Sequence, residues 1–68
     1  MIKILIIDNN SADQRIDRFL KKFFDNLNQS FIEKNLRKKN ILLNQTLTKS
    51  NQIIKVGDKI TIKNFSKE

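Results

Sequence analysis

The alternation of apolar and polar residues divides the first part of the chain into a strand and a helix. Residues 2–7 are largely β-branched and apolar and are followed by the polar run 8–11, a pattern typical of a strand that ends in a turn. We expect Ser11 or Asp13 to cap a helix over 13–24. Apolar residues then recur at the spacing i, i+3, i+4, i+7 and i+8, which defines one face of that helix: Ile16, Phe19, Leu20, Phe23 and Phe24.

A second helix is predicted over 28–39. Asp25-Asn26 ends the first helix, and Asn28 is the predicted N-cap of the second. Asn40 suits the left-handed position after the helix, because Asn tolerates positive φ better than other non-glycine residues. The spacing i, i+4 directs Ile32 and Leu36 inward. Four polar residues are directed outward: Ser30, Lys34, Arg37 and Lys38.

The remainder of the chain is predicted to form short strands joined by turns. The apolar or alternating runs lie at 41–43, 47–48, 53–54 and 59–63. Turns are expected at 44–45 and 56–58, the second with Gly57 at positive φ. Residues 64–68 read as a frayed tail or the start of a linker. The pattern predicts an α+β domain of two packed helices on a small, mainly antiparallel β-structure.

Length and composition limit the classes of function. With 68 residues the chain forms one domain with a small core. Cys and His are both absent, so there is no disulfide, no usual zinc framework and no imidazole base. The Asp residues are scattered, and we expect no catalytic site, metal or cofactor. No apolar run approaches the length of a transmembrane helix, and we expect a cytoplasmic protein.

The net charge of +7 indicates a polyanionic partner. Residues 1–14 sum to −1, residues 15–39 to +5 and residues 40–68 to +3, so the excess is concentrated on the two predicted helices. A genome rich in A and T inflates Lys but not Arg, which makes the arginines informative. The alternative is a solvated helix face supported by the pairs Asp17–Lys21 and Glu33–Arg37 at i, i+4.

From residue 15 to residue 60 the chain resembles the S-four RNA-binding domain, or αL motif, the module named after ribosomal small-subunit protein four. The segments that carry the resemblance occur in the family's order: Arg-Ile-Asp-Arg-Phe-Leu at 15–20, Asn-Leu-Asn-Gln-Ser at 26–30, Arg-Lys-Lys at 37–39, Leu-Asn at 43–44 and Lys-Val-Gly-Asp-Lys-Ile at 55–60. Gln29 and Phe31 stand where Arg is common, and Gln45 replaces a turn Gly, which makes a tight type I′ hairpin less expected.

The resemblance implies that structured RNA is bound at the start of the first helix, the basic second helix and the turn that follows. Ser30 also lies near a helix N-terminus, where an anion is favoured. Phe31 falls between the inward positions, so we expect it to be exposed, and it is the one aromatic considered for base stacking. The candidate RNA-binding residues are Arg15, Arg18, Gln29, Ser30, Lys34, Arg37, Lys38, Lys39, Asn44 and Lys49.

Within this family the chain is most similar to the N-terminal domain of RluC-like large-subunit rRNA pseudouridine synthases. That resemblance implies that 1–68, with a core at 13–62, is excised from a longer enzyme whose catalytic domain is missing here, and that the partner is large-subunit rRNA. The Arg-Ile-Asp segment at 15–17 is not expected to be an active site. The alternatives are a stand-alone ribosome-associated S-four protein, the equivalent domain of a tRNA synthetase, or a basic membrane-surface or protein-docking module.

Overall fold

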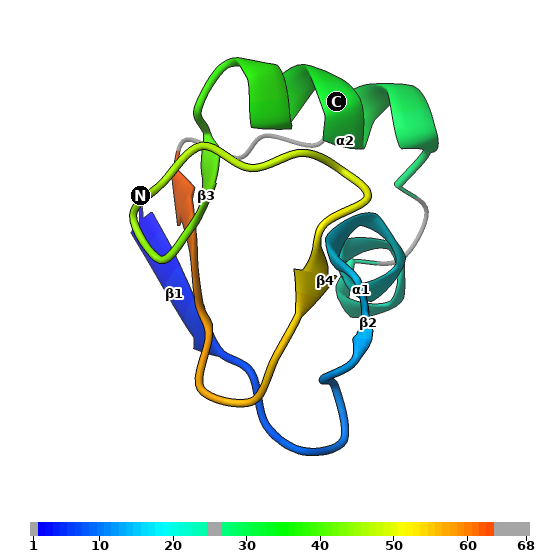
Figure 1. Cartoon of the computed structure of the whole chain (residues 1–68). Helices are drawn as coiled ribbons and strands as arrows, with labels where there is room; N and C mark the ends of the chain where they lie inside the picture. Colours follow the sequence, from blue (N-terminus) through cyan, green and yellow to red (C-terminus); the bar gives the residue numbers. More distant parts are fainter. Residues whose placement is uncertain (1, 25–26, 64–68) are drawn as a thin grey trace.

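The computed structural model describes residues 2–24 and 27–63, which form an α+β arrangement of two helices and small antiparallel sheets (Figure 1). The predicted fold class is therefore confirmed. The predicted helix end at Asp25-Asn26 and the tail 64–68 lie outside the described residues. In chain order the elements are β1 (Ile2–Ile6), β2 (Gln14–Arg15), α1 (Ile16–Phe23), α2 (Gln29–Arg37), β3 (Ile41–Leu43), β4 (Ile53–Ile54) and β5 (Lys59–Lys63).

Two small sheets and the two helices enclose one apolar core. The first sheet has the order β1-β5-β3, with Ile4 opposite Thr61 and Ile41 opposite Ile62, and the second pairs β2 with β4. In Figure 1, α2 lies across the top of the strands, while α1 is seen nearly end-on beside β4. The core is formed by buried residues from every layer: Ile7, Ile16, Phe19, Leu20, Leu27, Ile32, Leu36, Ile41, Ile54, Ile60 and Ile62.

The first helix begins at Ile16, later than predicted, because the residues before it form a strand. Gln14 and Arg15 pair with β4, and Asp13 lies in the left-handed region at φ +63°. The amides of Ile16 and Asp17 donate to the carbonyls of Gln52 and Ser50, at 2.8 and 3.2 Å. Carbonyls of a distant segment thus satisfy amides that a cap would have served. The prediction that Ser11 or Asp13 caps the helix is wrong, since Arg15 holds that position without a side-chain cap.

The second helix has the predicted start and a different end. Asn28 Oδ1 accepts from the Phe31 amide at 2.8 Å, which confirms the N-cap. At the other end Lys39, not Asn40, takes the left-handed conformation at φ +64°. The amide of Lys39 donates to the Leu36 carbonyl and that of Asn40 to the Asn35 carbonyl, which is the Schellman pattern of a helix C-terminus. The side-chain amide of Asn40 instead donates from Nδ2 to Asn35 Oδ1, at 2.9 Å.

The predicted strands at 41–43, 53–54 and 59–63 are confirmed, but residues 47–48 form no strand. After β3 the chain forms an isolated antiparallel β-bridge between Thr46 and Leu43. Asn44 and Gln45 have φ of +51° and +67°, and Leu43 and Thr46 exchange backbone hydrogen bonds. Positive φ at both central residues is the signature of a type I′ turn, so this turn is tight although Gln45 replaces Gly. Gly57 has the predicted positive φ, at +90°.

Among the residues that the structure describes, apolar side chains of α1 and of β1 are among those that remain exposed. Phe23 belongs to the predicted buried stripe of α1 but is 45% exposed, because two turns of helix cannot bury all five apolar residues. Its ring packs on Phe19 and Phe24, at centroid distances of 5.8 and 4.9 Å, and the Lys3 ammonium lies 5.7 Å from it. On β1 the exposed side chains lie on the outer face, where three isoleucines are more than half exposed: Ile2, Ile4 and Ile6.

Candidate nucleic-acid interface

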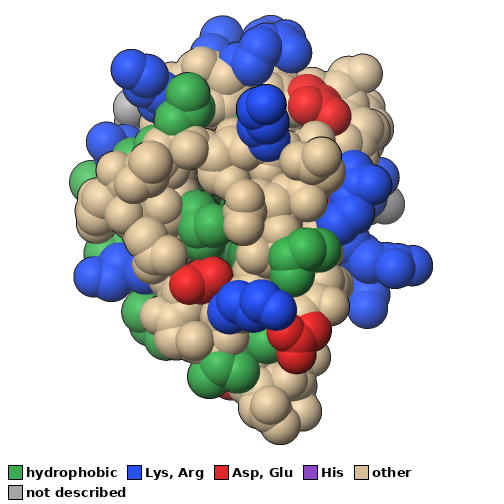
Figure 2. Space-filling view, in the orientation of Figure 1, with side chains coloured by type: hydrophobic (Ala, Val, Ile, Leu, Met, Phe, Trp, Pro, Cys, Tyr) green, Lys and Arg blue, Asp and Glu red, His purple; other side chains and the backbone are tan. Residues whose placement is uncertain are grey.

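The outward face of α2 is basic, as the sequence predicts. Ser30, Lys34, Arg37 and Lys38 are all exposed, while Ile32 and Leu36 are buried on the opposite face. Figure 2 shows Lys and Arg side chains in one group over α2 and in another beside α1, with acidic atoms between the two groups. The basic residues of the two helices are therefore neighbours but do not form an uninterrupted positive surface.

A hollow of about 550 Å³ lies between α2 and the segment 47–51, which passes below α2 in the view of Figure 1. Three of the predicted RNA-binding residues, Arg15, Arg37 and Lys49, come from different elements and line it together. Leu36 and Leu47 contribute apolar walls. A hollow of this size is within the range of small-ligand clefts. We define this hollow as the α2 groove.

A second hollow of about 320 Å³ lies beside the first, on the α1 side. Arg15 lines both hollows, so they meet at this residue. The second hollow brings together Arg15, Arg18 and Gln29 from the predicted set, with Asp17 and Lys21. The pairing of β2 with β4 is what places Arg15 at the junction, because it fixes the backbone just before α1 begins.

A network of side-chain hydrogen bonds joins the two hollows. Two nitrogens on one edge of the Arg15 guanidinium donate to Asp17, Nε to Oδ1 at 3.1 Å and Nη2 to Oδ2 at 2.9 Å. Gln29 Nε2 donates to Asp17 Oδ2 at 3.1 Å and to Glu33 Oε2 at 2.8 Å. Ser50 Oγ donates to the same Glu33 oxygen at 3.0 Å. The network therefore fixes α1, α2 and the segment 47–51 relative to one another. Asp17 pairs with Arg15 here and not with Lys21 as considered above.

The network keeps both carboxylates ionised. Burial by itself would raise the pKa of Asp17, but hydrogen bonds from Gln29 and Arg15 outweigh it and lower that pKa below its ordinary value of 3.8. Hydrogen bonds from Gln29 and Ser50 lower the pKa of Glu33 below its ordinary value of 4.5. Both groups are therefore negative at neutral pH, next to the cations of the α2 groove.

These lowered pKa values predict acid sensitivity. A carboxyl group with a lower pKa in the folded than in the unfolded chain stabilises the fold above its unfolded pKa and loses that contribution as the pH falls through its folded pKa. We therefore expect the urea midpoint of unfolding to fall as the pH is lowered below about 4.5. The double variant Asp17→Asn, Glu33→Gln should show a shallower decline over that range. An equal decline in the variant and the parent would contradict this role of the network.

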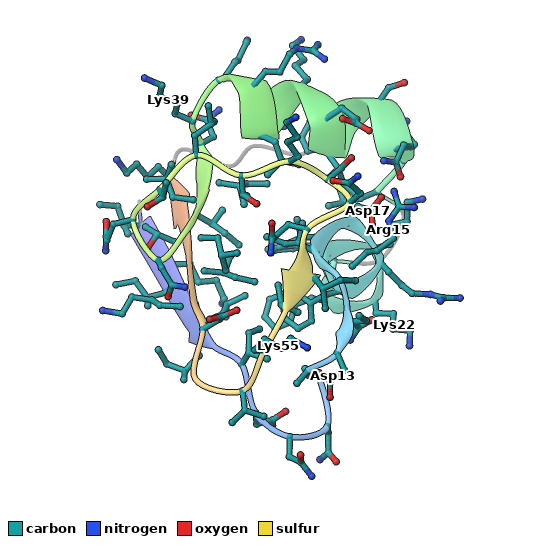
Figure 3. The ribbon with its side chains drawn as sticks, viewed as in Figure 1. Asp13, Arg15, Asp17, Lys22, Lys39 and Lys55 are labelled. Carbon is teal, nitrogen blue, oxygen red and sulfur yellow. The ribbon has the colours of Figure 1, made fainter. Side chains whose placement is uncertain are left out.

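Five of the ten predicted RNA-binding residues line neither hollow: Ser30, Lys34, Lys38, Lys39 and Asn44. Lys39 lies at the opposite end of α2 from Arg15 and Asp17 (Figure 3). The Asn44 amide donates to Asp58 at 3.1 Å, and its oxygen accepts from the Lys59 amide at 3.0 Å, so it holds two turns together. Phe31 is half-buried and packs against the core, so the expectation that it would be exposed is wrong.

Eight residues that line the two hollows are not among the predicted RNA-binding residues: Asp17, Lys21, Glu33, Leu36, Leu47, Thr48, Ser50 and Asn51. The sequence pattern pairs Glu33 only with Arg37 on the same helix, and it predicts a strand at Leu47. The available signal was the polar run 48–52, which is too long for a tight turn and therefore indicates a surface loop. The pairing of β2 with β4 determines which helix that loop contacts, and the local sequence pattern does not predict this pairing.

No protein-family profile matches this chain. Curated relatives named ribosomal large subunit pseudouridine synthase C do match it. The Rickettsia felis protein is 41% identical over 59 residues, the Rickettsia prowazekii protein 40% over 62 and the Buchnera aphidicola protein 34% over 61. The chain is similar to a region of large-subunit pseudouridine synthases. These alignments cover 85–90% of the chain, which spans about a fifth of the length of each relative.

These similarities agree with the predicted resemblance to an RluC-like domain. The relatives' names refer to the ribosomal large subunit, which is consistent with the predicted class of RNA. In the part of the chain that the structure describes, neither helix is long and apolar enough to cross a membrane.

Proposed function

We propose that this chain is an S-four-type RNA-binding domain that carries no catalytic residues and directs a large-subunit rRNA pseudouridine synthase to structured rRNA. The observation that carries the proposal is the convergence of Arg15, Arg37 and Lys49 on the α2 groove, next to Lys34 and Lys38. The binding unit is residues 13–62, and the catalytic domain is a separate part of the same polypeptide. The similarity to enzymes about five times as long supports this arrangement.

The cations that form no ion pair within the protein are available to bind phosphate. Within residues 2–24 and 27–63 the ion pairs are Arg15–Asp17 and Lys55–Asp13, so the cations of α2 and Lys49 are unpaired there. Each phosphate that they neutralise releases condensed counterions, which favours binding at low salt. Arg15 is held by Asp17 and presents a fixed guanidinium edge, so we assign it to orientation of the RNA more than to net charge.

Filter binding of a structured rRNA fragment across a salt series tests the proposal. With three to five phosphate contacts, the logarithm of the affinity should fall linearly with the logarithm of the salt concentration, with a slope of roughly −2 to −4.5. Absence of saturable binding at low salt would contradict an RNA-binding function.

A membrane-surface or protein-docking role is the second candidate, because the outer face of β1 exposes Ile2, Ile4 and Ile6. The helical apolar stripes that such a module would insert into a membrane are, however, largely buried, with Ile16 and Ile32 fully enclosed. Co-sedimentation with anionic liposomes, run beside an RNA gel shift, separates the two. We expect the gel shift only, and liposome binding that exceeds RNA binding would favour the second candidate.

We expect no pseudouridine synthase activity from this chain alone. Asp17 is buried and holds Arg15 and Gln29, so it is part of the structural network and is not available to a substrate. Tritium release from labelled uridine in rRNA fragments should stay at background. Turnover that disappears in Asp17→Asn would show that this carboxylate is an active-site group after all.

A further inference from the structure

Glu33 is the one feature of the α2 groove that phosphate binding does not explain. The groove is otherwise lined by cations and by neutral side chains, and an ionised carboxylate among them repels phosphate. Its negative charge therefore selects for a group that offers hydrogen-bond donors.

The carboxylate is held in one orientation. Gln29 Nε2 and Ser50 Oγ both donate to Oε2, at 2.8 and 3.0 Å, from two different elements. The other oxygen, Oε1, accepts no hydrogen bond from any side chain that the structure describes. Glu33 thus presents a fixed acceptor from the wall of the groove, with no competing partner among those residues.

The other walls suit the flat face and the flanks of a nucleotide. Leu36 and Leu47 line the groove, and Leu47 is 55% exposed, so a ring placed there would cover apolar surface. Arg37 and Lys49 line the same hollow and could bind the phosphates on either side of the ring.

We propose that the α2 groove binds an unpaired guanine of the RNA, with Oε1 of Glu33 accepting hydrogen bonds from both donors of its Watson–Crick edge. This inference rests on the proposed RNA-binding function and identifies the chemical group that the groove selects. Guanine is the base whose Watson–Crick edge presents two adjacent donors, N1–H and the N2 amino group. Adenine and cytosine place a ring-nitrogen acceptor beside their amino group, and uracil flanks N3–H with two carbonyls, so each would set a lone pair against the carboxylate.

The base must be unpaired, since pairing occupies that edge, and single-stranded loops are where proteins read RNA sequence. The test uses RNA hairpins that are identical except for one loop nucleotide, which is G, A, C or U. Fluorescence anisotropy at fixed salt should show the G hairpin bound about ten-fold more tightly than the others, the order of discrimination that one well-formed pair of base contacts provides.

Glu33→Gln tests whether the Glu33 carboxylate recognises the base. The new carboxamide oxygen can still accept from Gln29 and Ser50, so we expect the fold to persist, as circular dichroism would verify. Its amino group then faces the groove and opposes the donors of guanine, so the ten-fold preference should disappear. The salt slope should stay the same because no phosphate contact is lost.

Asp13→Asn is the matched control. It removes the same charge from an exposed site away from α2 (Figure 3), where Asp13 pairs with Lys55 at 3.1 Å. It should alter binding of all four hairpins equally and leave the preference for guanine. Equal affinity of the parent for the four hairpins, or a preference that survives Glu33→Gln, would overturn the guanine site while leaving RNA binding intact. No binding of any hairpin would instead overturn the proposed function, and the site with it.

Discussion

Leu20→Ala is expected to remove a large part of the free energy of unfolding. Leu20 is fully buried in α1, in the core that both helices share with the sheets. Truncating a buried leucine costs about 2–5 kcal/mol, and a native domain has roughly 5–15 kcal/mol in total, with short chains near the lower end. Urea titration followed by circular dichroism at 222 nm should show a much lower midpoint or no folded baseline.

Phe23→Ala is the control for Leu20→Ala. Both residues lie in the apolar stripe of the same helix, but Phe23 is 45% exposed and packs mainly on two other phenylalanines. We expect a loss of about 1 kcal/mol or less, as for most exposed positions. Similar losses for the two variants would mean that the core does not lie where the structure places it.

Arg37→Ala combined with Lys49→Ala is expected to have the largest effect on RNA binding. These cations come from α2 and from the segment 47–51 and meet at the α2 groove. If each contacts one phosphate, the salt slope should become shallower by about 1.4–1.8, which is twice the value for one contact. The loss should be similar for different RNAs, because phosphate contacts carry no sequence information directly. Filter binding at several salt concentrations measures the slope.

Lys55→Ala combined with Lys59→Ala removes the same charge from the turn between β4 and β5 and from the first residue of β5. Lys55 lies away from α2 (Figure 3). The Lys55–Asp13 pair is exposed at both ends, so losing it should cost little stability. We expect little change in the salt slope. If this pair flattens the slope as much as Arg37 and Lys49 do, the charge acts as a diffuse attraction and there is no localised RNA face.

The elements were predictable where local pattern and local physics agree. Asn28 is a preferred N-cap residue and caps α2, so the start of that helix followed directly from the sequence. Ile32 and Leu36 were assigned inward by spacing alone and are buried. The start of α1 was mispredicted because capping signals at Ser11 and Asp13 compete with strand pairing, which depends on residues about 40 positions away in the chain.

The candidate site was predictable only in part for the same reason. A run of cations on α2 is a local feature, and the sequence identified Lys34, Arg37 and Lys38 as outward-facing. The groove is not local, since Arg15, Glu33 and Ser50 meet only after β2 pairs with β4 and the segment 47–51 is carried to α2. The bonds from Gln29 and Ser50 changed the interpretation of Glu33 from a helix-surface charge to a fixed acceptor.

Backbone-amide NMR of the isotope-labelled chain, titrated with a structured rRNA fragment, tests the central claim most directly. The account predicts that the largest shift changes map to α2 and to residues 47–51, with a second set at Arg15 and Arg18. Amides of β1 and of the turn between β4 and β5 should change little. Shift changes spread evenly over the basic residues, or concentrated on the exposed isoleucines of β1, would contradict an RNA interface at the α2 groove.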